Sequence, residues 1–524
     1  MSVRLTLPSW LEPLPDAAEQ RALDEWAIGE RGLSGLDLME RAGRGVADLV
    51  GELQPSGRVV VVCGKGNNGG DGFVAARRML ARGRDVRVLT LDAVEDLRGD
   101  ARTNAERLGG PLPEPFQAQA LTGARAIIDA IFGTGFSGQP RDQAVVAIDA
   151  INAHTDDAVV VACDVPSGVD GSTGEVAGAA VRASATATFH AGKPGLWISP
   201  GKAHAGEVRV IKIGIPSGGP ARPGIGLITA RVTDGVPRRG RESTKFVAGS
   251  VLVCGGSTGL TGAPCLACEA AMRAGAGYVT ALVPGSLNQT FEGRLLEVMT
   301  VPLPDERGSL QPSGAEQALE RCGRAGALVL GPGFGREPGA AALARTLAAK
   351  APTALLLDAD ALNAHAGELA SLAHRAAATV LTPHAGELAW LLGCDSATVG
   401  RRRLHSVRRA AREARAIVVL KGDDTLIAAP DGRVAVSRGG APALATAGTG
   451  DVLSGVIGAY LAKAMDPFHA ACAGVAVHAS AGRLAARTVG AEGVIARDVI
   501  EALPRALPVV AVDPPPSANG SGNH

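Results

Sequence analysis

The 524-residue sequence has few aromatic residues, no excess of either charge and no long apolar run. Aromatic residues make up only 3% of the chain, which leaves few platforms on which nucleic-acid bases could stack. Lys plus Arg and Asp plus Glu each number 52, so no net field attracts nucleic acid or an acidic membrane. No uninterrupted run of about 18 apolar residues occurs, and residues 1–10 lack the apolar region of a signal peptide. We therefore expect a soluble, cytoplasmic protein with no nucleic-acid or membrane partner.

The cysteines also lack the pattern of a disulfide framework. All eight are scattered, and several lie in apolar, strand-like runs such as 251–254. This distribution favours reduced, buried thiols. Cys265 and Cys268 form a CxxC pair without a partner pair, so core packing is favoured over a redox or metal role.

Apolar runs of strand length alternate with helical apolar spacing, which predicts an α/β fold with two domains. The first, residues 1–215, is expected to be a Rossmann-like doubly wound domain. Residues 216–226, rich in Pro and Gly, are interpreted as a linker, residues 227–512 as a second α/β domain and residues 513–524 as a disordered tail. The predicted strands are 58–63, 86–91, 126–130, 158–163, 186–189 and 207–213 in the first domain, and 250–254, 279–283, 327–330, 354–357, 379–381, 417–420 and 425–428 in the second.

Three polar loops follow apolar strands of the first domain, at residues 64–72, 131–138 and 164–170. Open α/β sheets bind ligands at the carboxyl ends of their strands, so these loops are expected to converge on one site. The glycine-rich first loop is predicted to lead into a helix at 73–83. Asp129 and Asp164 serve either as turn caps or as functional carboxylates.

The second domain contains a glycine loop at 445–451 that opens a helix. Gly448 and Gly450 allow backbone N–H groups to approach an anion, and the helix N-terminus adds unpaired donors. Asp451 either caps this helix or accepts a proton from a hydroxyl that attacks phosphate. Further polar loops follow the predicted strands at 255–264, 331–335, 358–363, 382–387 and 421–425.

Taken in order, these residues resemble the bifunctional NAD(P)H-hydrate repair enzymes over roughly residues 14–510. The most specific motifs are 66–72 (Gly-Asn-Asn-Gly-Gly-Asp-Gly), 164–168 (Asp-Val-Pro-Ser-Gly) and 448–451 (Gly-Thr-Gly-Asp). The resemblance implies an epimerase domain followed by a ribokinase-like dehydratase domain. It implies that the first interconverts the R and S hydrates of NADH and NADPH (NADHX and NADPHX). The second would dehydrate the S form with ADP, or alternatively ATP, and release AMP and phosphate.

In the first domain the resemblance implies two sets of residues. Asp164 is expected to be catalytic, and Asn68, Asp129 and Ser167 are expected to bind a potassium ion through oxygen ligands. The expected contacts to the hydrated dinucleotide are Asn67, Asn68, Gly69, Gly70, Asp71, Gly133, Thr134, Gly135, Phe136, Ser137, Gly138, Gln139 and Asp164.

In the second domain it implies Asp451 as the base for phosphate transfer to the C6 hydroxyl, which turns hydroxide into a better leaving group. The residues expected near the hydrate are Ala263, Gly333, His384 and Asp451, and those near the nucleotide are Lys421, Gly422, Asp423, Asp424, Thr425 and Gly450. Lys421 either pairs with phosphate or solvates its loop. Asp358 and Asp360 either organise magnesium or simply form a turn.

Histidines are weighed by their position in the chain. His384 follows a strand end, and a substrate hydrogen bond is favoured for it over a structural role. His469 and His478 lack that context and are interpreted as helix histidines. A homo-oligomer is expected.

The chain departs from the family pattern at two places. Gly440-Ala441-Pro442 stands where many relatives carry Gly-Asn-Pro, and residues 243–246 lack the usual His-Lys-Gly while keeping Lys245. Neither change touches Asp451, but nucleotide affinity and the choice between ADP and ATP stay open. Two other functions are compatible with the motifs: a ribokinase-type small-molecule kinase fused to a dinucleotide-binding domain, and a first domain that acts only as a dinucleotide sensor or protein-binding module.

Overall fold

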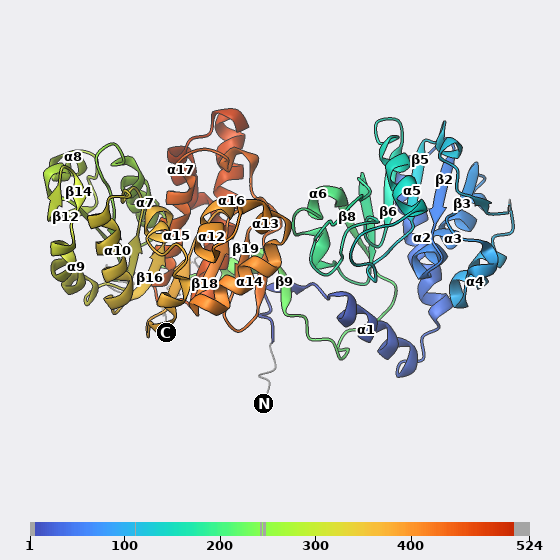
Figure 1. Cartoon of the computed structure of the whole chain (residues 1–524), viewed down its shortest axis with the longest axis horizontal. Coiled ribbons are helices and arrows are strands. Elements are labelled where there is room, and N and C mark those ends of the chain that lie inside the picture. Colours follow the sequence, from blue (N-terminus) through green and yellow to red (C-terminus); the bar gives the residue numbers. More distant parts are fainter. Residues whose placement is uncertain (1–5, 111, 241–243, 245–247, 508–524) are drawn as a thin grey trace, which may run out of the picture.

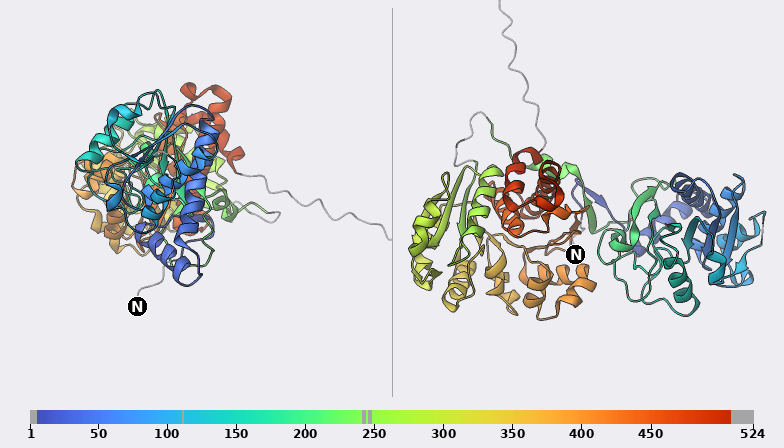
Figure 2. Two further views of the ribbon diagram at one scale, coloured as in Figure 1. Left: turned by 90° about the vertical axis from the view of Figure 1, so that its right-hand side faces the viewer. Right: turned by 90° about the horizontal axis from the view of Figure 1, so that it is seen from above.

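The computed structural model describes residues 6–110, 112–240, 244 and 248–507. The expected tail at 513–524 and the positions Ser243, Lys245 and Phe246 lie outside this range. The described residues form two α/β bodies that lie in a row, each built on its own sheet (Figures 1 and 2). This arrangement confirms the predicted α/β fold class.

The first body is built on a parallel sheet of seven strands among the described residues, in the order β4-β3-β2-β5-β6-β7-β8. The chain runs outward from β2 to β4 and then returns to place β5 beside β2, which makes the β2/β5 boundary the switch point. The strands are β2 (Val59–Cys63), β3 (Val86–Thr90), β4 (Glu114–Pro115), β5 (Ala126–Ala130), β6 (Val159–Cys163), β7 (Ala185–Phe189) and β8 (Glu207–Ile211).

Helices cover both faces of this sheet, which explains its continuous apolar strands. In β2, Val59 and Val61 pack into one core and Val60 and Val62 into the other, so every position of the strand is buried. The first core includes α1 (Ala17–Gly29), α2 (Gly35–Leu53), α3 (Asn67–Leu80) and α4 (Gly99–Glu106), and the second includes α5 (Gln143–Asn152).

The second body is built on a sheet of eleven strands among the described residues, in the order β1-β9-β20-β19-β18-β17-β16-β15-β10-β11-β12. Strands β10 to β12 and β15 to β18 run parallel, and the switch point lies between β10 and β15. The strands are β9 (Ile225–Ile228), β10 (Ser250–Cys254), β11 (Tyr278–Pro284), β12 (Met299–Leu303), β15 (Ala327–Leu330), β16 (Ala354–Leu357), β17 (Thr379–Leu381), β18 (Ile417–Leu420), β19 (Leu426–Ala428) and β20 (Val434–Val436), with β13 (Asp305–Glu306) and β14 (Ser309–Leu310) paired separately.

Two helical layers sandwich this second sheet. One core contains α7 (Gly262–Arg273), α8 (Asn288–Glu292), α15 (Thr449–Ala462), α16 (Pro467–Val489) and α17 (Ala496–Ala506). The other contains α9 (Ala315–Cys322), α10 (Pro338–Lys350), α11 (Ala359–Asn363), α12 (Ala385–Leu392) and α14 (Arg403–Ala414), with α13 (Ser396–Arg401) beside them.

The N-terminal strand crosses from one body to the other. Strand β1 (Leu11–Pro13) pairs antiparallel with β9 at the edge of the second sheet, whereas the next helix, α1, packs on the first body. Strand β9 itself starts at Ile225, inside the last two residues of the expected linker. The two bodies are therefore joined by two chain segments, one before α1 and one after β8.

Most predicted strands match the structure to within two residues, but the first glycine loop does not. Helix α3 begins at Asn67, with Gly66 as its N-cap, so residues 67–72 are helical and not part of a turn. The composition of a glycine-rich segment suggests a turn. Here the glycines lie in a helix, and they are needed because the helix packs too closely on its neighbours to leave room for a Cβ atom. The signature residues Asn67 to Asp71 therefore lie in the first turn and a half of a helix.

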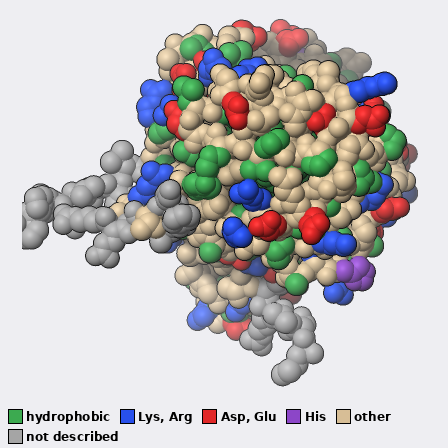
Figure 3. Space-filling model, turned by 90° about the vertical axis from the view of Figure 1, so that its left-hand side faces the viewer, with side chains coloured by type: hydrophobic (Ala, Val, Ile, Leu, Met, Phe, Trp, Pro, Cys, Tyr) green, Lys and Arg blue, Asp and Glu red, His purple; other side chains and the backbone are tan. Residues whose placement is uncertain are grey.

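All eight cysteines are free, and seven of them are buried, including Cys265 and Cys268 in α7. Among the described residues, no helix combines the length and the apolar character needed to cross a bilayer. Figure 3 shows acidic and basic side chains interspersed on the end of the second body, without a patch of one sign on that face.

Candidate active sites

The first site lies at the switch point of the seven-stranded sheet. The chain leaves β2 at Cys63 and enters α3 at Asn67, so the unpaired N–H groups of this helix lie at the carboxyl edge of the sheet. A Cβ atom on Gly69 would lie 1.9 Å from the carbonyl oxygen of Gly64. Only glycine allows this tight entry of the chain into α3.

Asp164 follows β6 and is held by neighbours from two other segments. Its Oδ2 accepts hydrogen bonds from the Thr134 N–H at 2.9 Å and the Thr134 hydroxyl at 2.5 Å, and its Oδ1 lies 2.8 Å from Lys193 Nζ. Burial opposes ionisation of Asp164, but the Lys193 ammonium and the Thr134 donors outweigh it and lower the pKa of the carboxyl. Asp164 is therefore ionised at neutral pH.

Lys193 was missed by the sequence reasoning. It follows β7, its side chain is 1% exposed, and its Nζ also donates to the carbonyl of Phe189 at 2.8 Å and the hydroxyl of Thr188 at 3.1 Å. A lysine just past a strand end, in the sequence Gly192-Lys193-Pro194-Gly195, satisfies the same positional rule that singled out Asp164. That rule would have found it.

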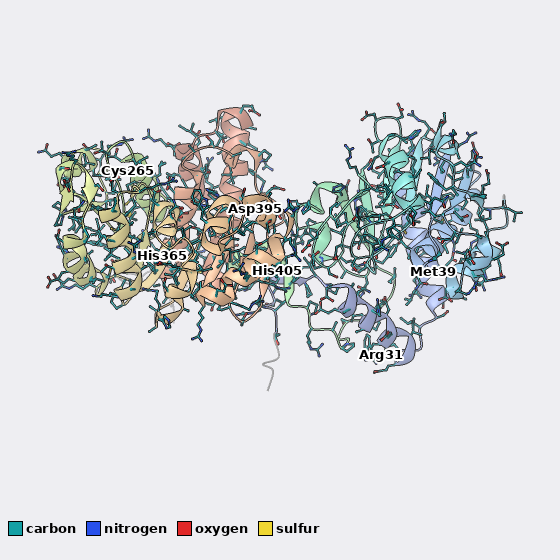
Figure 4. All side chains as sticks on the ribbon, in the orientation of Figure 1. Arg31, Met39, Cys265, His365, Asp395 and His405 are labelled. Atoms are coloured by element: carbon teal, nitrogen blue, oxygen red, sulfur yellow. The ribbon has the colours of Figure 1, made fainter. Side chains whose placement is uncertain are left out.

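A cavity of about 160 Å³ opens beside this pair. Asp71, Asp164 and Lys193 line it from the sheet side, and Asp24 of α1 and Met39 of α2 line it from the helices; Figure 4 labels Met39 in this body. Burial raises the pKa of Asp71 well above its usual range, and the charge of Asp164 adds to the rise. The cavity thus holds the ionised carboxylate of Asp164, the Lys193 side chain paired with it and the buried carboxyl of Asp71.

A second polar cluster lies directly behind the loop after β5. Asp129 is fully buried and accepts hydrogen bonds from the Ser167 N–H at 2.8 Å and the Ser167 hydroxyl at 2.6 Å. Burial raises the pKa of Asp129 to about 6, although these hydrogen bonds oppose the rise. Both polar atoms of the Asn68 amide are buried and have no hydrogen-bond partner among the described residues. The unsatisfied amide oxygen of Asn68 and the buried carboxylate of Asp129 are ligand types that suit a hard monovalent cation.

The structure brings part of the predicted first site together. Of the predicted residues, Asn67, Asp71 and Asp164 line the cavity. Thr134 is hydrogen-bonded to Asp164, and a Cβ on Gly133 would lie 3.1 Å from Asn68 Oδ1 and 3.2 Å from Asp164 Oδ2. Asp129 and Ser167 form a hydrogen-bonded pair that does not line the cavity, and neither does the rest of the loop, Gly135 to Gln139. There, Phe136 stacks on Phe132 with ring centroids 4.7 Å apart, and a Cβ on Gly178 would meet the Gln139 side chain.

The second site lies at the switch point of the eleven-stranded sheet. Ala263, at the start of α7, and Gly333, after β15, are neighbours: a Cβ on Gly333 would lie 3.3 Å from that of Ala263. Gly333 has a φ of +61°, and its carbonyl accepts a hydrogen bond from the Ser257 hydroxyl at 3.0 Å. These two positions, predicted from sequence to lie near one ligand, are indeed adjacent.

The glycine loop before α15 has the predicted form. Gly448 is the N-cap with a φ of +88°, and Asp451 lies half-buried in the first turn of the helix. A Cβ on Gly450 would lie 3.7 Å from Lys421 Nζ, which places the helix start beside the loop after β18. A helix N-terminus and a lysine thus meet at one point, as an anion site requires.

Lys421 is the centre of an acidic cluster. Its Nζ lies 3.0 Å from Asp358 Oδ1 and 3.7 Å from Glu387 Oε2, and the Ser454 hydroxyl donates to Asp358 Oδ2 at 2.7 Å. Burial raises the pKa of Asp451 to about 7, and the negative charge of Asp358 adds to this rise while Lys421 opposes it. Burial lowers the pKa of Lys421, but Asp358 and Glu387 outweigh it and produce a net rise. The site holds a charged lysine and a carboxyl that titrates near neutrality.

The two acids named as magnesium candidates are already engaged. Asp358 is shared by Lys421 and Ser454, and Asp360 accepts the Gly335 N–H at 3.0 Å and lies 3.2 Å from Arg336 Nε. Within the part of the chain that the structure describes, no group of three His, Cys, Asp or Glu side chains is arranged to hold a metal ion. The side chains present do not fit a protein-built magnesium site at Asp358 and Asp360.

Two histidines have specific places here. His384 is the N-cap of α12, where its Nδ1 accepts the N–H groups of Gly386 at 3.0 Å and Glu387 at 3.2 Å. Its side chain is 57% exposed, and its Nε2 lies 3.6 Å from Glu387 Oε1. His478 of α16 is buried against the Thr449 backbone, and burial lowers its pKa to about 4. The sequence alone had left His478 without a context.

Known protein families match the two bodies of this chain separately, one family model for each. Residues 251–505 match the family model described as NAD(P)H-hydrate dehydratase, and residues 35–195 match the model described as YjeF-related protein N-terminus. The chain is 40% identical to the bifunctional NAD(P)H-hydrate repair enzyme Nnr of Moorella thermoacetica, covering 94% of this chain and 96% of that protein. It is 34% identical to the enzyme of the same name from Escherichia coli K12, covering 92% of each chain.

One solved structure is also similar to the second half. It is the ADP/ATP-dependent NAD(P)H-hydrate dehydratase of Bacillus subtilis co-crystallised with ATP/Mg²⁺, with 27% sequence identity and a TM-score of 0.46. The similarity covers 53% of this chain and 96% of the Bacillus subtilis chain.

Proposed function

The chain belongs to the family of bifunctional NAD(P)H-hydrate repair enzymes, and from that premise we propose which of its residues carry out each reaction. The first domain epimerises the R and S hydrates of NADH and NADPH. The second dehydrates the S form with ADP as the phosphate donor. The observation that carries this proposal is the pairing, at the carboxyl edge of each sheet, of a largely buried lysine with a carboxylate: Lys193 with Asp164, and Lys421 with Asp358.

In the first domain, Asp164 and Lys193 act as base and acid on the C6 hemiaminal of the hydrated ring. Asp164 is ionised and takes the proton of the C6 hydroxyl. The C6–N1 bond then breaks, its electron pair goes to N1, and Lys193 supplies a proton there. Rotation of the resulting aldehyde and reclosure on its other face produce the opposite epimer. Asp71, buried in the same cavity as Asp164, hydrogen-bonds the ring amide.

Potassium is proposed as the resident ion of the first domain. Asn68, Asp129 and Ser167 would hold it, and its charge would favour the anionic dinucleotide beside the start of α3. The unpartnered Asn68 oxygen and the buried Asp129 carboxylate support this assignment.

In the second domain, Asp451 accepts the proton of the C6 hydroxyl as that oxygen attacks the terminal phosphorus of ADP. The N–H groups at the start of α15 and the Lys421 ammonium stabilise negative charge on the transferred group. The lone pair of N1 then expels phosphate from C6, and a proton leaves C5 to solvent. The products are NAD(P)H, AMP and phosphate. Magnesium accompanies the nucleotide.

The hydrate-binding residues of this site are Ala263, Gly333 and His384. The adjacency of Ala263 and Gly333 supports this placement, as does the exposed side chain of His384. The nucleotide lies against the loop Lys421–Thr425 and Gly450.

The test is recovery of reduced-nicotinamide absorbance from a mixture of R and S NADPH hydrate with magnesium and either ADP or ATP. The intact chain should convert the whole mixture with ADP. Asp451→Asn should abolish the conversion, and Asp164→Ala should stop it near the S fraction. Absence of NADPH with both nucleotides contradicts the dehydratase assignment, and complete conversion by Asp164→Ala contradicts the role of Asp164.

A further inference from the structure

The loop assigned to the nucleotide is held by residues of the other domain. The backbone N–H of Ser199 donates to Asp424 Oδ2 at 2.7 Å, and Lys202 Nζ lies 2.5 Å from Asp423 Oδ2. Both partners come from one short segment of the first domain, which follows Lys193 and leads into α6 (Lys202–Ala205). The loop is thus contacted across the domain boundary at two consecutive residues.

Asp424 is the more deeply buried of the two. Its side chain is 3% exposed, and the same Oδ2 that accepts the Ser199 N–H also accepts Arg403 Nε at 2.9 Å. Arg403 belongs to α14, which begins at the boundary between the bodies; Figure 4 labels its neighbour His405 there. A buried carboxylate needs both of its donors, because loss of either leaves charge without compensation. Ser199 is therefore part of what holds this loop in place.

Asp423 connects the loop to a second segment of the site. Besides Lys202, its Oδ1 accepts the Gly440 N–H at 3.2 Å. Gly440 precedes Ala441, which stands where many relatives carry an asparagine. This segment leads to the glycine loop before α15. A Cβ on Gly439 would lie 3.2 Å from Lys202 Nζ. Lys202 therefore lies beside both segments that border the proposed nucleotide site, the loop 421–425 and residues 439–440.

We infer that Lys202, together with the Ser199 N–H, is a positioning group for the nucleotide site of the second domain. The nucleotide affinity of the dehydratase then depends on the first domain, although no first-domain residue takes part in phosphate transfer. This inference rests on the proposed nucleotide role of Lys421–Thr425 and adds a determinant of affinity outside that loop. The fusion of the two domains thereby affects nucleotide binding in the second domain.

Charge reversal at Lys202 tests the inference. The initial rate of dehydration of purified S hydrate is measured against ADP concentration, with epimerisation measured separately on the same preparations. Lys202→Glu should raise the KM for ADP by about five-fold, since partly exposed ion pairs have modest energies, and should leave kcat and epimerisation within about two-fold. Lys202→Arg should restore the parent KM.

Glu175→Gln is the matched control. Glu175 lies 3.4 Å from Arg402 across the same boundary, but it does not contact the loop Lys421–Thr425. The KM of the Glu175→Gln variant for ADP should equal that of the parent. The inference is overturned if Lys202→Glu has the KM of this control.

Failure of the proposed function is recognised separately. If the intact chain dehydrates no hydrate with ADP or ATP, the function fails, and calorimetric titration of ADP with magnesium decides the inference by itself. A Kd for Lys202→Glu about five-fold above that of Glu175→Gln supports it, and equal Kd values overturn it.

Discussion

The ammonium group of Lys193 lies 2.8 Å from Asp164 Oδ1, with the lysine side chain 1% exposed and the aspartate side chain 13% exposed. The two residues come from the ends of adjacent parallel strands, β7 and β6. Burial of both charges costs free energy, which is recovered only because each group has further hydrogen-bond partners. An ion pair of this kind at the edge of a cavity is poised for proton transfer.

Replacement of Lys193 by Met should remove the acid of the epimerisation. We expect the rate of R-to-S interconversion to fall by about 100-fold or more, which is typical for loss of a general acid. The pKa of Asp164 should rise as well, because its main cation is gone. The measurement is chromatographic separation of the two epimers over time. Dehydration of purified S hydrate is the internal control, and epimerisation within two-fold of the parent would show that Lys193 is only structural.

Dehydration should depend on the ionisation of Asp451. Its pKa is raised to about 7, so the base is increasingly protonated below that pH and the rate should fall about ten-fold per pH unit on the acid side. Asp358→Asn removes a negative charge that raises this pKa, and the acid limb should move to lower pH even if kcat also falls. The pH profile of kcat/KM for the S hydrate checks both points. An acid limb at the same pH in parent and variant would contradict the proposed coupling.

The same pKa shift has a consequence for stability. The folded pKa of Asp451, about 7, lies above the unfolded value of about 3.9, so stability falls as pH rises between these values and stays level above them. The Asp451→Asn variant has no ionisable group at this position, so it does not lose stability in this pH range. Its Tm should exceed that of the parent by about 1–3 °C at pH 8 and match it near pH 4. Thermal unfolding across this pH range, with the exposed Asp156→Asn as control, provides the measurement. A Tm difference independent of pH would contradict it.

Potassium should stabilise the first domain through Asn68 and Asp129. Replacing choline chloride by potassium chloride at constant ionic strength should raise the Tm of the parent, because the ion binds the folded state. Asn68→Ala and Asp129→Asn should lose this increase. The readout does not need activity, so it separates ion binding from catalysis. A potassium effect of equal size in Asn68→Ala would show that the ion binds elsewhere.

The α/β fold and most of its strands could be predicted because they depend on local patterns. Strands such as Val59–Cys63 are buried on both faces and read as continuous apolar runs, and Gly448 marks a helix start by its chain position. Local patterns failed at α3, where glycines required for close packing resembled a turn. They also failed at β1, which is too short to show a period and depends on pairing with β9.

The sequence by itself determined the fold class, the strand ends that carry polar groups and, through its motifs, the family. Tertiary structure alone decided which of those groups meet. Asp358 and Lys421 are 63 positions apart, and Lys202 and Asp423 are 221 positions apart. A charged side chain is buried at low cost only when a group of opposite charge lies beside it. The order of the strands in the sheet determines which residues lie beside one another. For that reason the pairing of Lys193 with Asp164, and that of Lys202 with Asp423, could be recognised only once the two sheets were in place.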